Sequence, residues 1–150
     1  MFSNLKSAIQ EFTSKATEEK YNGEDVQAVI ILLLEACQID GETGQVEIDY
    51  IKKLLVNKFG FNEKDANDNI SKAIEDSEQR IEIFSQIKVI LNEMDHEERI
   101  EVIEMMWGVI LADGIIDDFE ANLMRRMNGL LYVSGVESAA AKEKALTQLK

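Results

Sequence analysis

The sequence predicts an all-α protein, and three observations support that prediction. The 150 residues contain no proline, and few runs alternate apolar with polar residues as a half-buried strand would. Apolar residues instead recur at helical spacing along most of the chain. A segment made of an apolar helix, an acidic turn and an amphipathic helix occurs twice. We therefore expect one domain over residues 1–150, a bundle of seven to eight helices with an internal pseudo-twofold repeat of helical hairpins.

The first half of the chain contains clear helix boundaries. We expect helices over residues 3–19, 24–39, 45–59 and 63–76. The N-terminal helix has an apolar stripe and should pack on the body of the domain, whose core we place at about 25–134. Gly60 is typical of the residue that follows a helix, and Asn62 is a favourable N-cap for the next one. That fourth helix has few apolar positions and should lie on the surface.

The second half should supply four more helices. We expect them over residues 78–93, 95–112, 118–133 and 137–149. Ser77 is a candidate cap for the first of these, and Asp95 with Glu98 has the spacing of a capping box. The helix that ends before Asp113 is almost wholly apolar, so it should lie at the centre against the helix over 24–39. The last helix is alanine-rich, and we expect it to be loosely held.

Composition excludes several classes of partner and site. The net charge of −13 argues against a nucleic acid or an anionic membrane surface as the main partner. The single cysteine, Cys37, excludes an internal disulfide and fits a reducing compartment. No secretion signal or membrane-spanning segment is visible, so we expect a cytoplasmic protein without membrane insertion. His96 is the only histidine, which excludes a multi-histidine zinc site within one chain.

The repeated hairpin carries the candidate chemistry in its turns. An Asp-Gly pair ends the apolar helix in each copy, at residues 40–41 and 113–114, and a glutamate follows each aspartate seven residues later. This spacing matches the second half of an EF-hand calcium loop. The positions of the first ligands hold apolar or neutral residues instead, which excludes a standard EF-hand: Ala36, Gln38, Val109 and Leu111.

Two interpretations of these turns remain open. In the structural one, the aspartates bond turn amides and the glutamates cap the helix that follows. In the other, a hard cation such as Ca²⁺ or Mg²⁺ binds carboxylates and exposed helix carbonyls, and the metal ligands are Asp40, Glu47, Asp113, Asp117 and Glu120. An aspartate is unfavourable at a helix C-terminus, so a cation, an amide or a basic side chain should compensate. The candidate basic residues are Lys52, Lys53, Arg99, Arg125 and Arg126.

Three segments of the chain resemble the TerB family of tellurite-resistance proteins. They are LLLEACQIDG, EIDYIKKLL and ERIEVIEMMWGVILADGIIDDFEANLMRRMNGLLYVS, and the resemblance covers roughly residues 25–134. It implies a small all-helical domain with internal pseudosymmetry, associated with tellurite and stress resistance and with metal sensing. The acidic positions of the family would correspond here to Asp40, Glu47, Asp113 and Glu120.

The sequence supports three functional hypotheses. The first is a non-catalytic cytoplasmic TerB-like module with a divalent cation at its acidic turns. The second is a protein–protein adaptor in which the turns are purely structural. The third is a metal-dependent hydrolase, although no nucleophile elbow, phosphate-binding loop or dinucleotide fingerprint is present. The sequence specifies neither the protein partner nor the oligomeric state.

Overall fold

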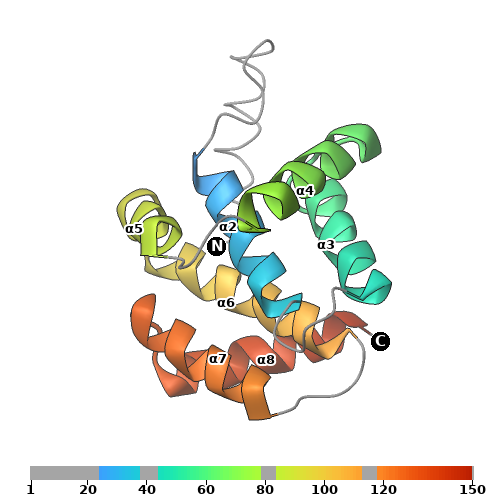
Figure 1. The fold of residues 1–150 in the computed structure, drawn as a ribbon. Coiled ribbons are helices and arrows are strands. Elements are labelled where there is room, and N and C mark those ends of the chain that lie inside the picture. The colour runs from blue at the N-terminus through green and yellow to red at the C-terminus, as the bar shows by residue number, and fades with distance from the viewer. Residues whose placement is uncertain (1–23, 38–43, 79–83, 113–117, 150) are drawn as a thin grey trace.

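Seven α-helices make up most of the computed structural model, which describes residues 24–37, 44–78, 84–112 and 118–149 (Figure 1). They are α2 (Glu24–Cys37), α3 (Gln45–Asn57), α4 (Glu63–Glu78), α5 (Phe84–Glu93), α6 (His96–Leu111), α7 (Asp118–Leu130) and α8 (Gly135–Leu149). The described ranges contain no strand, which confirms the all-α prediction. The helix expected over 3–19 lies outside them.

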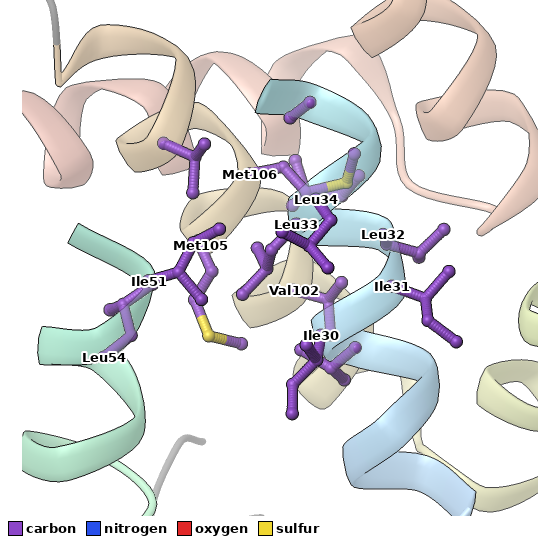
Figure 2. Packing of buried hydrophobic residues seen from close by; sticks show 14 of the residues in the cluster. Ile30, Ile31, Leu32, Leu33, Leu34, Ile51, Leu54, Val102, Met105 and Met106 are labelled. Atoms are coloured by element: carbon purple, nitrogen blue, oxygen red, sulfur yellow. The ribbon is translucent and has the colours of Figure 1, made fainter. Parts of the chain in front are cut away.

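Helices α2 and α6 pack against each other at the centre, as the sequence predicted. Most residues of α2 and of the second half of α6, from Val102 to Leu111, are apolar and buried. Figure 2 shows Leu33 of α2 directed toward α6, with Met105 of α6 beside Ile51 of α3. Because three helices contribute to one continuous core, the burial of apolar surface fixes their relative positions.

The remaining helices lie on two sides of this central pair (Figure 1). On one side, α4 and α5 pack on α2, and α3 packs on α2, α4 and α6. On the other side, α7 and α8 pack on α6. The two hairpins, α2–α3 and α6–α7, bury the same positions of their second helices, because Ile51 and Leu54 correspond to Met124 and Met127 and all four are buried. None of the helices within the described ranges is long and apolar enough to cross a membrane.

The expectation that the last helix is loosely held was wrong. Helix α8 makes its most extensive packing with α6. The indole Nε1 of Trp107 donates to Ser138 Oγ at 3.0 Å, and the Lys142 ammonium lies 5.2 Å from the centre of the indole ring. Ala141 and Ala145 are buried against the core. The alanines that suggested a weak helix provide a thin face that lets the two backbones approach.

Several helix boundaries follow from local capping signals. Asn62 Oδ1 accepts from the Asp65 amide at 2.8 Å, and Asp95 and Glu98 form the complete capping box at the start of α6. Gly60 has a φ of 80° after α3, the left-handed conformation that favours glycine. These three predictions are confirmed.

Helices α3 and α7 end at Asn57 and Leu130, two and three residues before their predicted ends, and boundaries of α4, α5 and α8 also differ from the prediction. Ser77 lies inside α4, which continues to Glu78, and α5 begins at Phe84. The buried positions of α4 extend to Ala73, so its packing on α2 and α3 supports the helix past the local stop signal. Helix α8 begins at Gly135 because Ser134 and Glu137 form a second capping box, in which each backbone amide donates to the other side chain.

Candidate functional site

Glu47 is a buried carboxylate in the first turn of α3. Its side chain is 8% exposed and folds back over Gly44, the N-cap of the helix, which has no side chain to cap the helix itself. A Cβ atom at position 44 would collide with the Glu47 carboxylate. The glycine thus leaves room for a negative charge at the N-terminus of α3, where the helix dipole favours it.

Glu120 occupies the same position in the second hairpin. It lies in the first turn of α7 and is 7% exposed. The two residues before it, Asp118 and Phe119, are exposed. Both copies of the hairpin therefore bury the glutamate that follows the acidic turn, although glutamate is usually an exposed residue.

The structure describes only these two of the five predicted metal ligands. Asp40, Asp113 and Asp117 lie outside the described residues, as do both Asp-Gly pairs. Within residues 24–37, 44–78, 84–112 and 118–149, no three histidine, cysteine, aspartate or glutamate side chains form a group that could hold a metal ion. The metal hypothesis for the turns stays a prediction.

Three of the basic residues considered as counter-charges have other partners. Arg99 donates to the Leu131 carbonyl at 3.2 Å and to the Asp95 carbonyl at 3.3 Å. The Lys52 ammonium lies 3.2 Å from a carboxylate oxygen of Glu63. Arg99 therefore joins the start of α6 to the end of α7, and Lys52 joins α3 to α4. Arg125 donates to the side chain of Asn122 on its own helix.

A second group of carboxylates was missed by the sequence analysis. It lines a groove of about 240 Å³ between α6 and α8, here called the α6–α8 groove, made by Glu97, Ile100, Glu101, Glu104, Glu137, Ala140, Ala141 and Lys144. Glu101 and Glu104 of this central helix are buried, which is unusual for glutamate side chains. The spacing of Glu97, Glu101 and Glu104 places them on one helix face, and this was the sequence signal available.

Glu101 is the most perturbed of these groups. Its burial raises the pKa from 4.5 to about 7, the neighbouring carboxylates of Glu104 and Glu98 act in the same direction, and Lys58 on α3 acts against them. Glu101 thus changes its charge near neutral pH.

The raised pKa of Glu101 predicts how the stability of the protein depends on pH. Because the folded state raises the pKa of Glu101, its ionisation destabilises the fold progressively as the pH rises from about 4.5 to about 7. We expect Glu101→Gln to raise the midpoint of urea unfolding at about pH 8 and to leave it nearly unchanged at about pH 4. Glu97→Gln, at an exposed position of the same helix, is the matched control. A lower midpoint for Glu101→Gln at about pH 8 would contradict the prediction.

A second depression lies between α3 and the end of α8. It has a volume of about 250 Å³ and is lined by Tyr50, Lys53, Leu54, Asn57, Lys58, Gln148 and Leu149. The ring of Tyr50 reaches α6 at Gly108, and burial together with the Glu104 carboxylate raises the pKa of its phenol. Lys53 and Lys58 line this second depression, whereas glutamates line the α6–α8 groove.

Comparisons with known proteins identify a family and a fold. A family model described as tellurite resistance protein TerB matches residues 26–143. A comparison with curated proteins gave no match. Among solved structures, a crystal structure of a protein of unknown function from Porphyromonas gingivalis W83 is similar, with 20% sequence identity and a TM-score of 0.61. The match covers 82% of this chain and 90% of that one, and at this identity it shows the fold alone.

Proposed function

This chain belongs to the TerB family, and on that premise we propose that it is a non-catalytic helical module that holds a divalent cation, Ca²⁺ or Mg²⁺, at its two acidic turns. Asp40 and Glu47 would supply ligands to one cation, and Asp113, Asp117 and Glu120 to the other. A link to tellurite resistance rests on the name of the family.

The observation that supports this proposal is the paired burial of Glu47 and Glu120. Both stand at the third residue of a helix, directly after an acidic turn. Carboxylate oxygens are the ligands that hard cations prefer, and helix carbonyls can complete their coordination. A cation would also compensate the aspartate that the sequence predicts at the end of the preceding helix. The competing explanation is that both glutamates are simple helix caps.

Replacing the glutamates by glutamine separates these two roles. Glutamine can replace glutamate in a capping box, but a neutral amide is a much weaker ligand for Ca²⁺ or Mg²⁺. We expect calorimetric titration of the chain to show cation binding, Glu47→Gln or Glu120→Gln to abolish one site each, and the double variant to abolish both. Each occupied site should also stabilise the protein by about 2.7 kcal/mol when the free cation exceeds the Kd of that site about a hundredfold.

Matched controls exist on the same helices. Asp49→Asn and Asp118→Asn remove exposed carboxylates from α3 and α7 and should leave binding unchanged. If the wild-type chain shows neither heat nor a change in melting temperature with excess Ca²⁺, Mg²⁺ or Mn²⁺, the cation proposal is wrong and the structural interpretation of the turns stands. Turnover in a broad phosphatase and esterase screen would refute the non-catalytic part.

A further inference from the structure

The α6–α8 groove combines apolar surface with carboxylates of two kinds: Glu97 and Glu137 are at least partly exposed and form its acidic rim, whereas Glu101 and Glu104 are buried. Ile100 of α6 and Ala140 and Ala141 of α8 supply the apolar surface. A depression of this kind can take up an apolar side chain while its rim attracts a positive charge. The α6–α8 groove is separate from Glu47 and Glu120, neither of which lines it.

We propose that the α6–α8 groove docks a basic amphipathic helix of a partner protein. An apolar side chain of that helix enters the groove over Ala140 and Ala141, and a lysine or arginine side chain on its flank pairs with the exposed carboxylate of Glu97. This is recognition of a helix in a groove, in which anchors recur at helical spacing.

Charge complementarity selects a basic partner. Four glutamates and a single lysine line the groove, and the chain carries a net charge of −13. A potential of one sign over a low-dielectric surface attracts the opposite charge from a distance and repels acidic competitors. An acidic or neutral helix would gain the apolar contact without this attraction.

The volume of the α6–α8 groove favours a side chain of a partner helix over a free small molecule. The groove holds about 240 Å³, below the range of about 300–1,000 Å³ typical of small-molecule sites. That volume suits one or two side chains projecting from a larger partner. Part of the rim is already ordered, because Glu137 accepts from the Ser134 amide at 2.9 Å and lies 2.8 Å from His96 Nε2. An ordered rim lowers the entropy lost on binding.

Glu101 makes the predicted binding sensitive to pH. A partner's cation favours the ionised form of this buried carboxylate, so binding should release a proton and strengthen as the pH rises through about 7. Among the residues that the structure describes, the charged groups around it include Glu98 and Glu104 on α6, Lys58 at the C-cap of α3, and Glu97, Glu137 and Lys144 in the groove. His96 contacts Glu137 at the same end of the groove.

The test uses the full chain and a fluorescent amphipathic peptide of about five helical turns, with leucines on one face and lysines on the other. Ala140→Arg fills the groove and places a cation in it, whereas Ala139→Arg puts the same side chain one residue away. Both alanines are exposed, and only Ala140 lines the groove. We expect fluorescence anisotropy to show peptide binding that Ala140→Arg weakens at least about tenfold, while Ala139→Arg stays within about twofold.

Further arms separate groove binding from plain charge attraction. An oligolysine of equal charge should bind at least about tenfold more weakly than the amphipathic peptide. The amphipathic peptide should bind more tightly at about pH 8 than at about pH 6, and Glu101→Gln should remove most of that difference. Addition of EDTA should leave its affinity unchanged, so the result does not depend on the proposed cations.

Several outcomes would overturn the docking proposal. These are equal weakening by the two arginine variants, equal affinity for oligolysine, or a pH dependence that persists in Glu101→Gln. If light scattering shows that the chain alone is a dimer, and Ala140→Arg makes it a monomer, the groove is occupied by a second copy. The proposal of a basic partner helix is then wrong.

Discussion

Gly108→Val is expected to lower the free energy of unfolding by about 3 kcal/mol. Gly108 lies in the middle of α6, where a glycine usually weakens a helix by about 0.5–1 kcal/mol relative to alanine, so helix propensity alone would predict stabilisation by a larger residue. The phenol of Tyr50 prevents this. A Cβ atom at position 108 would lie 2.6 Å from Tyr50 Cζ and 2.7 Å from Cε2, and valine adds two methyl groups beyond it.

The matched control is Gly129→Val on α7, where a Cβ atom would meet nothing within 4 Å. We expect that variant to change stability by less than about 0.5 kcal/mol in urea unfolding. A double-mutant cycle identifies the cause, because Tyr50→Ala should remove most of the cost of Gly108→Val. If both glycine variants cost the same, or if Tyr50→Ala leaves the cost of Gly108→Val unchanged, the contact between α3 and α6 does not explain the glycine.

The same glycine shows where sequence-based reasoning stops. The capping signals at Asn62 and at Asp95 with Glu98 were interpreted correctly because the donor and the acceptor lie within one turn of each other. The need for a glycine at position 108 is explained only by the folded structure, in which α3 places Tyr50 against it. The prediction that Ser77 caps a helix was wrong for a related reason, because tertiary packing extends α4 beyond this favourable local cap.

The two candidate sites also differ in how far the sequence predicted them. The repeat predicted that Glu47 and Glu120 are equivalent, and the structure gives both the same burial and helix position. The aspartates of the turns lie outside the described residues, so their role remains proposed. The α6–α8 groove was not predicted, because its two walls come from helices far apart in the sequence. The burial that raises the pKa of Glu101 exists only in the folded structure.

Helix α8 should prove essential to the fold, and Ala145→Glu is the variant that tests this. Ala145 is 0% exposed, and a glutamate there would place a carboxylate in the contact between α8 and the core. Since burying an unpaired charge is very costly, α8 must either detach or distort. We expect a loss of about 4 kcal/mol or more in the free energy of unfolding, whereas Ala139→Glu, on the exposed face of the same helix, should cost less than about 0.5 kcal/mol.

The fluorescence of the single tryptophan, Trp107, shows whether α8 detaches in the Ala145→Glu variant. Trp107 is buried on α6, and its indole donates to Ser138 of α8, so detachment of α8 exposes the ring and shifts its fluorescence to longer wavelength. Peptide binding should be lost in parallel, because α8 forms one wall of the α6–α8 groove. If Ala145→Glu keeps native fluorescence and unfolds at the same urea concentration as Ala139→Glu, α8 is a peripheral helix. The structural basis for a groove between α6 and α8 then fails with it.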